Sequence, residues 1–148
     1  MITVEPGAWR STLQDARDRG MTCLDLLTAV DRGTYVDVIV RVLDPLVGTG
    51  EDLSTSVTGG SLHSISTVYP GAMWHERETA EMFGLEFEGL GDQRPLLLRA
   101  TVAQPPLRTA VLLAERAANP WPGSAEPGGS PGRRRLLPPG VPDEGVVR

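Results

Sequence analysis

The chain has 148 residues, of which 40% are hydrophobic, and its 14 basic and 19 acidic residues give a formal net charge of -5. This length suits one domain with a sizeable hydrophobic core. The acidic balance argues against nucleic acid as the main partner. A single cysteine, Cys23, excludes an internal disulfide and favours a reducing compartment.

The N-terminal residues Met1–Pro6 contain neither a basic region nor an apolar core. We therefore expect no signal peptide. No stretch of the chain approaches the roughly 18 consecutive apolar residues of a membrane span. Any association with a membrane is expected to occur through a partner protein.

The first predicted element is a short amphipathic helix over Trp9–Arg19, which Gly20 ends. Trp9, Leu13 and Ala16 fall on one side of this helix, and polar residues occupy the other side. The pattern predicts that the three apolar side chains face the core.

Two β-strands are predicted next, over Thr22–Val30 and Tyr35–Leu43. The second strand is the clearest in the chain, because its β-branched residues alternate with Asp37 and Arg41. We expect it to lie well inside a sheet. Cys23 is predicted to be a small core residue of the first strand.

A loop is predicted over Asp44–Asp52, followed by strands over Leu53–Val57 and Ser61–Ile65. Gly59 and Gly60 between these strands suggest a hairpin turn. Together the elements predict an α+β fold, with a small mixed or antiparallel sheet of about three or four strands, packed helices and an extended C-terminal tail.

A helix is predicted over Ala72–Phe83, about three turns long. Pro70 and Gly71 form a turn signal before it, and Gly84 is placed to cap its C-terminal end. The apolar residues of this helix spread around its circumference, with charged residues between them, instead of forming one stripe.

Two interpretations of this helix remain open. Its charges form a solvated run, or the helix is clamped between this domain and a partner, which requires the buried charges to be paired. In the second case we expect Arg77 to pair with Glu81, one turn away, or with a carboxylate of a partner.

The helix and the residues after it carry a family resemblance. Glu76-Arg77-Glu78, Glu81-Met82-Phe83-Gly84-Leu85, Phe87 and Gly89 resemble the signature of the 30 kDa subunit family of respiratory complex I, in which this component is also called the C subunit. Tyr69–Trp74 resembles the aromatic-Pro-Gly-Ala segment that precedes this helix in the family. The resemblance covers roughly residues 20 to 125 and is strongest from 67 to 98.

Two later segments also compare with the family. Leu90-Gly91-Asp92-Gln93-Arg94 stands where family members read His-Pro-Asp-Leu-Arg, so Gly91 must make the turn here. Pro106-Leu107-Arg108 matches the start of the family's Pro-Leu-Arg-Lys segment, and Thr109 replaces the lysine.

The resemblance implies a non-catalytic subunit of the peripheral arm of a proton-translocating NADH:quinone oxidoreductase. Such a subunit holds the quinone-site subunit (the D subunit) and the neighbouring iron–sulfur subunits (B and I) together during electron transfer to quinone. It implies that iron–sulfur clusters, FMN and quinone belong to partner subunits, and that this chain alone is inactive. The expected location is the cytoplasmic side of the plasma membrane, reached through partners.

The candidate interface and signature residues come from this helix, the segment after it, the Pro-Leu-Arg match and the start of the tail. They are Trp74, Glu76, Arg77, Glu78, Glu81, Phe83, Gly84, Phe87, Gly89, Arg108 and Trp121. No residue of the chain is predicted to be catalytic or to bind a cofactor or metal.

His75-Glu76 invites comparison with the helix of zinc proteases, which needs a second histidine four residues after the first. Position 79 is Thr79, and the other histidine, His63, lies on a different predicted element. With one cysteine and two histidines, the chain lacks the ligands of the usual tetrahedral zinc site and of a four-thiolate iron–sulfur cluster.

The composition changes at Asn119, so the predicted domains are residues 1–118 and a tail of residues 119–148. Thirteen of these last 30 residues are proline or glycine. The tail is predicted to be disordered or to be an extended arm that orders on a partner. In the second case Trp121 is the expected anchor, and Arg133–Arg135 would meet acidic groups.

Two alternative functions remain at this point. The chain could be the matching subunit of a membrane-bound hydrogenase or of a related dehydrogenase with another electron donor. It could also be a free-standing adaptor domain, since the residues themselves indicate an interaction module without its own cofactor.

Overall fold

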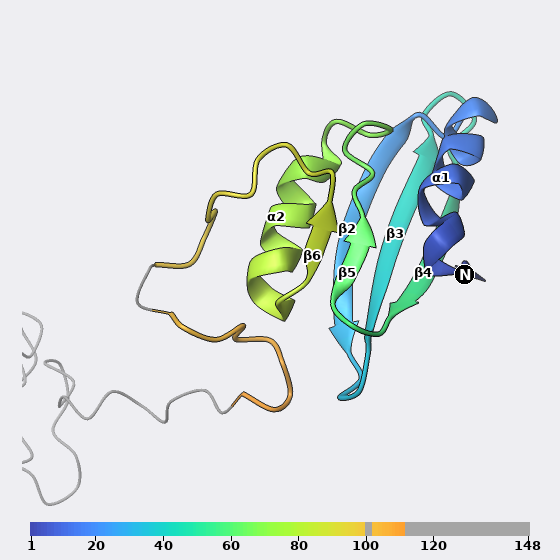
Figure 1. The fold of residues 1–148 in the computed structure, drawn as a ribbon. Helices are drawn as coiled ribbons and strands as arrows, with labels where there is room; N and C mark the ends of the chain where they lie inside the picture. The colour runs from blue at the N-terminus through green and yellow to red at the C-terminus, as the bar shows by residue number, and fades with distance from the viewer. Residues whose placement is uncertain (100–101, 112–148) are drawn as a thin grey trace, which may run out of the picture. The chain divides into compact units, whose positions relative to one another are not determined.

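The computed structural model describes residues 1–99 and 102–111 (Figure 1). The elements are β1 (Ile2–Thr3), a 3-10 helix η1 (Pro6–Ala8), α1 (Trp9–Asp18), β2 (Cys23–Asp31), β3 (Val36–Asp44), β4 (Thr49–Val57), β5 (Ser61–His63), α2 (Ala72–Phe83) and β6 (Glu86–Glu88). The predicted α+β class is confirmed. The predicted domain boundary at residue 118, the tail and nearly all of the segment Val111–Ala118 lie outside the described residues.

The main sheet is mixed and has the strand order β1-β4-β3-β2. β3 pairs antiparallel with both of its neighbours, and β1 adds a short parallel edge beside β4. The strand predicted over Tyr35–Leu43 therefore lies inside the sheet, as expected. Its alternation is also observed, because Val36, Val38, Val40 and Val42 are buried.

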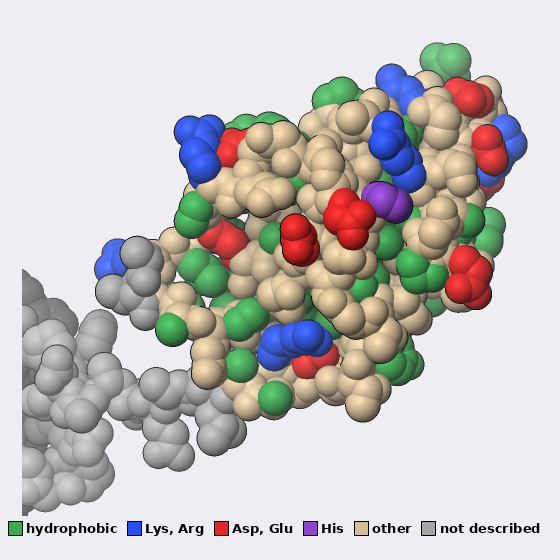
Figure 2. All heavy atoms as spheres, in the orientation of Figure 1, with side chains coloured by type: hydrophobic (Ala, Val, Ile, Leu, Met, Phe, Trp, Pro, Cys, Tyr) green, Lys and Arg blue, Asp and Glu red, His purple; other side chains and the backbone are tan. Residues whose placement is uncertain are grey.

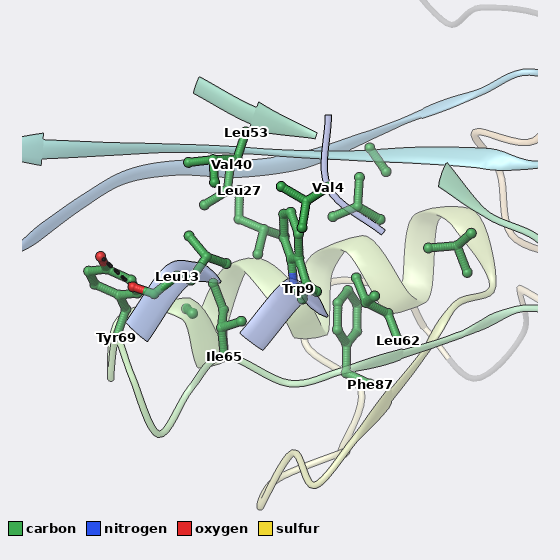
Figure 3. Packing of buried hydrophobic residues seen from close by; sticks show 14 of the residues in the cluster. Val4, Trp9, Leu13, Leu27, Val40, Leu53, Leu62, Ile65, Tyr69 and Phe87 are labelled. Atoms are coloured by element: carbon green, nitrogen blue, oxygen red, sulfur yellow. Dashed lines mark hydrogen bonds between the residues drawn. The ribbon is translucent and has the colours of Figure 1, made fainter. Parts of the chain in front are cut away.

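The hydrophobic core lies on one face of this sheet (Figure 3). Trp9, Leu13 and Ala16 of α1 are fully buried there, which confirms the predicted apolar side of the first helix. Leu27 and Val40 pack into the same core from the neighbouring strands β2 and β3. The hydrophobic effect thus fixes α1 and the sheet to each other.

The second small sheet corrects the predicted hairpin. β5 pairs in parallel with β6, with Leu62 opposite Phe87, instead of pairing with β4. Gly59 and Gly60 both have positive φ angles, of 99° and 88°, so they redirect the chain between β4 and β5. The β5–β6 pairing places Leu62 and Phe87 in the core, which a hairpin with β4 would not provide.

Two further expectations about the sheet are wrong. The segment Asp44–Asp52 is not a loop, because β4 begins at Thr49, which pairs with Asp44 across a short turn. Pairing with β3 satisfies backbone groups of a sequence with weak β-propensity. Cys23 is exposed, because it is the first residue of β2, which lies at the edge of the sheet.

Helix α2 has the predicted bounds, Ala72–Phe83, and it packs beside β2. Gly84 follows it in the left-handed conformation, with φ of 67°, and donates its N–H to the carbonyl of Ala80 at 2.9 Å. The predicted glycine cap is therefore confirmed. A Cβ at Gly84 would lie 2.7 Å from Cγ of Pro105, so the cap also allows a close approach of a later segment.

Gly84→Ala is expected to lower the free energy of unfolding by at least roughly 1–2 kcal/mol, because alanine is strained in the left-handed region and its methyl group meets Pro105. Gly71→Ala is the matched control, since Gly71 has φ of -65° and nothing lies within 4 Å of its would-be Cβ. Urea unfolding of both variants measures the effect. Equal stability of the two variants would contradict the assigned cap.

Candidate functional site

The candidate site is α2 together with the segment that follows β6. We call residues 92–99 and 102–111 the strap (Figure 1, yellow to orange). The signature residues of α2 divide into two groups. Glu76 and Arg77 are buried, whereas Trp74 and Glu78 are exposed. A surface helix usually buries its apolar residues and exposes its charges, so this arrangement requires internal partners for the charges.

Arg77 is 7% exposed and makes all its assigned polar contacts with the strap. Nε donates to the carbonyl of Arg94 at 2.9 Å, and Nη2 donates to the carbonyl of Pro95 at 3.1 Å. Nη1 lies 3.2 Å from Oδ2 of Asp92. The guanidinium also lies 5.3 Å from the ring centroid of Trp74, a cation–π contact. The expected pairing of Arg77 with Glu81 is thus replaced by contacts with the strap.

Asp92 is held by two arginines. Hydrogen bonds from the side chain and the backbone N–H of Arg94, with the charge of Arg77, hold the pKa of Asp92 well below its usual range. The Arg94 guanidinium contacts both carboxylate oxygens, at 2.8 and 2.7 Å. Asp92 therefore stays ionised and links the buried Arg77 to an exposed arginine.

Glu81 binds the next part of the strap through backbone groups. Its carboxylate accepts N–H groups from Leu96, Leu97 and Leu98, at 2.6, 2.8 and 3.4 Å. Partial burial acts to raise the pKa of Glu81, but these N–H donors outweigh it, so the pKa is lowered. Arg77 and Glu81 together fix the backbone of residues 94–98 along α2.

Glu76 has a different task. It is fully buried, and its two carboxylate oxygens accept the N–H of Ile65 and the hydroxyl of Ser64, both at 2.7 Å. Burial raises the pKa of Glu76, and the two hydrogen bonds oppose this shift. Glu76 therefore ties α2 to the segment after β5, with no cation paired to it among the described residues.

The end of the strap is attached at two further points. Leu107 donates its N–H to the carbonyl of Met82 at 3.0 Å, at the end of α2. Arg108 Nη1 lies 3.0 Å from Oδ1 of Asp31, and Thr109 donates its N–H and hydroxyl to Oδ2 at 2.7 and 2.6 Å. These hydrogen bonds, those of Thr109 first, keep the pKa of Asp31 well below its usual range. Arg108 thus joins the strap to β2.

The other predicted residues have mixed positions. Phe83 and Phe87 are buried in the core, and Gly84 and Gly89 have positive φ angles. Trp121 lies outside the described residues. The partners that the sequence did not indicate are Asp31, Ser64, Asp92 and Thr109. A signal existed only for Asp92, which stands at the aspartate of the family's His-Pro-Asp-Leu-Arg pattern.

Within residues 1–99 and 102–111, no group of three or more His, Cys, Asp or Glu residues is placed to hold a metal ion. No helix in the same residues is long and apolar enough to span a membrane. On the face drawn in Figure 2, acidic and basic side chains are interspersed with hydrophobic ones. The arrangement of α2 and the strap is a binding platform: charged side chains fix backbone, and an indole remains exposed.

Comparison with known proteins now adds the family. A family model described as "Respiratory-chain NADH dehydrogenase, 30 Kd subunit" matches residues 2–117. The chain belongs to this family. The signature of α2 and the strap contacts of Arg77 and Glu81 are therefore features of one of its members.

Several relatives are similar to this chain. The C subunit of a NADH-quinone oxidoreductase of Jannaschia sp. (strain CCS1) is 50% identical over 115 residues, which cover 72% of this chain and 55% of the relative. The corresponding C subunit of Bartonella bacilliformis is 33% identical over 105 residues, covering 64% of this chain and 47% of that protein. The chain thus spans about half the length of these two relatives.

Two further matches are more limited. A C/D subunit of the NADH-quinone oxidoreductase of Rhodopseudomonas palustris (strain BisB18) is 50% identical over 36 residues, which cover 24% of this chain and 6% of that protein. A chain of the membrane-bound sulfane sulfur reductase, an archaeal respiratory membrane complex, has a TM-score of 0.56 at 22% identity, covering 59% of this chain and 55% of that one. This last likeness shows a shared fold.

Arg77→Ala is expected to destabilise the chain by about 1–3 kcal/mol, because two strap carbonyls lose their donor. Arg77→Lys should recover only part of this, since one ammonium lacks the planar fork that reaches several acceptors. Thermal unfolding of the full chain measures both. Arg94→Ala is the control, because that side chain is 83% exposed and should change stability little. Equal melting of Arg77→Ala and wild type would exclude the strap role.

The raised pKa of Glu76 predicts a pH dependence with a defined sign. Above its ordinary pKa of 4.5 the folded state binds more protons at this site than the unfolded state. Stability therefore falls as pH rises through the folded-state pKa. Glu76→Gln keeps an acceptor for Ile65 but does not titrate. Urea unfolding should show wild type losing stability relative to Glu76→Gln as pH rises above 4.5.

The control for this measurement is Glu78→Gln, because Glu78 lies on the same helix and is exposed. Its stability difference from wild type should stay flat across the same pH range. A flat difference for Glu76→Gln as well would show that burial of Glu76 does not control this titration.

Proposed function

We propose that this chain is a non-catalytic subunit of the peripheral arm of a proton-translocating NADH:quinone oxidoreductase. Its role is to hold the quinone-site and iron–sulfur subunits together while electrons pass to quinone. Family membership supports this role, together with 50% identity to the C subunit of a NADH-quinone oxidoreductase. The electron carriers themselves, namely iron–sulfur clusters, FMN and quinone, belong in this proposal to partner subunits.

The proposed partners are the quinone-site subunit, which is the D subunit, and the iron–sulfur subunits B and I. A relative whose name joins C and D in one polypeptide supports the contact with the quinone-site subunit. In this arrangement the chain lies on the cytoplasmic side of the plasma membrane. It reaches the membrane through its partners.

The observation that carries the proposal is the exposed indole of Trp74. This residue is 54% exposed, whereas Trp9, the other described tryptophan, is fully buried. The Trp74 ring stacks on Arg77, which the strap in turn fixes. A tryptophan held in this way loses little side-chain freedom on binding, which favours its use as an interface anchor.

The charged residues of α2 support the anchor indirectly. Glu76, Arg77 and Glu81 have partners within the chain, so their contribution is a stiff helix and a fixed strap. In this proposal the partner meets the indole and the outer surface of the strap. The buried charges determine where that surface lies.

Incorporation into the membrane complex tests the proposal. A tagged full-length chain, expressed in cells that lack the native copy, should migrate with a large complex in a native gel. That band should contain NADH:quinone oxidoreductase activity and the partner subunits. Migration of the chain at its own small size would support an adaptor domain and contradict the proposal.

Trp74→Ala should reduce incorporation by about tenfold or more, as expected for loss of an interface hot spot of about 2 kcal/mol. Its melting temperature should stay close to that of wild type, because the side chain is largely in water. Tyr35→Ala is the matched control, since Tyr35 is an aromatic residue exposed at the turn between β2 and β3. Equal incorporation of both variants would remove Trp74 from the interface.

A further inference from the structure

The turn between β3 and β4 carries an unusual pair of side chains. Leu46 is 94% exposed and Val47 is 71% exposed. Apart from the N-terminal Met1, they are the most exposed large hydrophobic residues in the described part of the chain. The turn lies at the end of the sheet where α1 ends, away from α2 (Figure 1).

The backbone of this turn is held in one conformation. The Asp44 carbonyl accepts the N–H of Gly48 at 2.8 Å, and Oδ1 of Asp44 accepts the N–H groups of Leu46 and Val47 at 2.8 and 3.2 Å. Pro45 restricts its own φ angle, and Gly48 has a left-handed φ of 77°. The two aliphatic side chains therefore project from a preformed tip.

Folding of this chain does not explain the pair. Turns of this kind favour polar residues or glycine, and Leu46 and Val47 gain almost no burial within the domain. Single exposed hydrophobic residues are common, but two neighbours on a fixed turn form a compact apolar knob. Because the turn is preformed, seating the knob in a partner costs little conformational entropy.

The charges at the base of the turn indicate the chemistry of the partner. Asp44 has no cation partner among the described residues, and Glu51 is paired with Arg19 at 2.7 Å. The tip is thus apolar with an acidic base. Such a surface is repelled by anionic lipid headgroups and matches an apolar pocket with a basic rim on a protein.

We propose that the tip formed by Leu46 and Val47 inserts into an apolar pocket, rimmed by basic residues, on a partner subunit of the complex. This inference rests on the proposed function and adds a second contact, separate from that of Trp74. Contacts at two separated places would allow the chain to bridge neighbouring subunits. Each contact could then be lost without loss of the fold.

The test uses the full-length chain in cells that lack the native copy, with incorporation measured by native gel. The double variant Leu46→Ser with Val47→Ser should melt within about 1 °C of wild type, because both side chains are exposed. Its incorporation should fall by about tenfold or more. The conservative variant Leu46→Met with Val47→Ile should retain incorporation. Ile2→Ser, at a residue 51% exposed on β1, is the control.

The outcomes separate this inference from the proposed function. If wild type does not enter the complex, the proposed function fails. If wild type and the serine variant enter equally, only the role of the tip is overturned. A serine variant that melts much earlier than wild type would show that the tip serves the fold, and would also overturn the inference.

Photocrosslinking identifies what the tip touches. Benzoylphenylalanine in place of Leu46 should crosslink, in the intact complex, to one partner subunit at an apolar segment flanked by lysine or arginine. Crosslinks to lipid instead, or binding of the purified chain to phosphatidylglycerol vesicles that the serine variant loses, would overturn a protein pocket as the occupant.

Discussion

The buried guanidinium of Arg77 is the interaction on which the rest of the site depends. A charge at this depth is costly unless donors and acceptors satisfy it. Asp92 and the carbonyls of Arg94 and Pro95 provide those acceptors, so the strap must follow α2. The same contacts fix the cation against the Trp74 ring. One buried charge thereby sets both the path of the strap and the position of the exposed indole.

Two carboxylates on one helix show how environment decides the role of a charge. Glu76 is fully buried and meets one backbone N–H and one hydroxyl, and its pKa is raised. Glu81 meets three backbone N–H groups of the strap, and its pKa is lowered. The first holds α2 to its own domain, and the second holds the strap to α2. Neither carboxylate is left over for a partner, although both belong to the family signature.

These contacts change how an assembly role is understood. A charged helix suggests ion pairs between subunits, whereas here the charges give a rigid surface and apolar groups remain outside. Trp74 on α2 and the tip of the β3–β4 turn present such groups at separate places on the domain. In proteins, fixed aromatic and aliphatic anchors commonly contribute more binding free energy than exposed ion pairs. Within this family, the signature thus describes a support for contacts as much as the contacts themselves.

Elements with local signals could be predicted from the sequence, whereas contacts between distant groups could not. The period-2 pattern identified β3, the glycine after Phe83 set the end of α2, and the apolar spacing of α1 identified its buried side, because these features depend on near neighbours. The parallel pairing of β5 with β6 and the acceptance of Arg77 by Asp92, fifteen residues away, appeared only in the packed chain. The physical reason is that a buried charge is paired by whichever acceptors packing brings to it, and sequence periodicity carries no record of that choice.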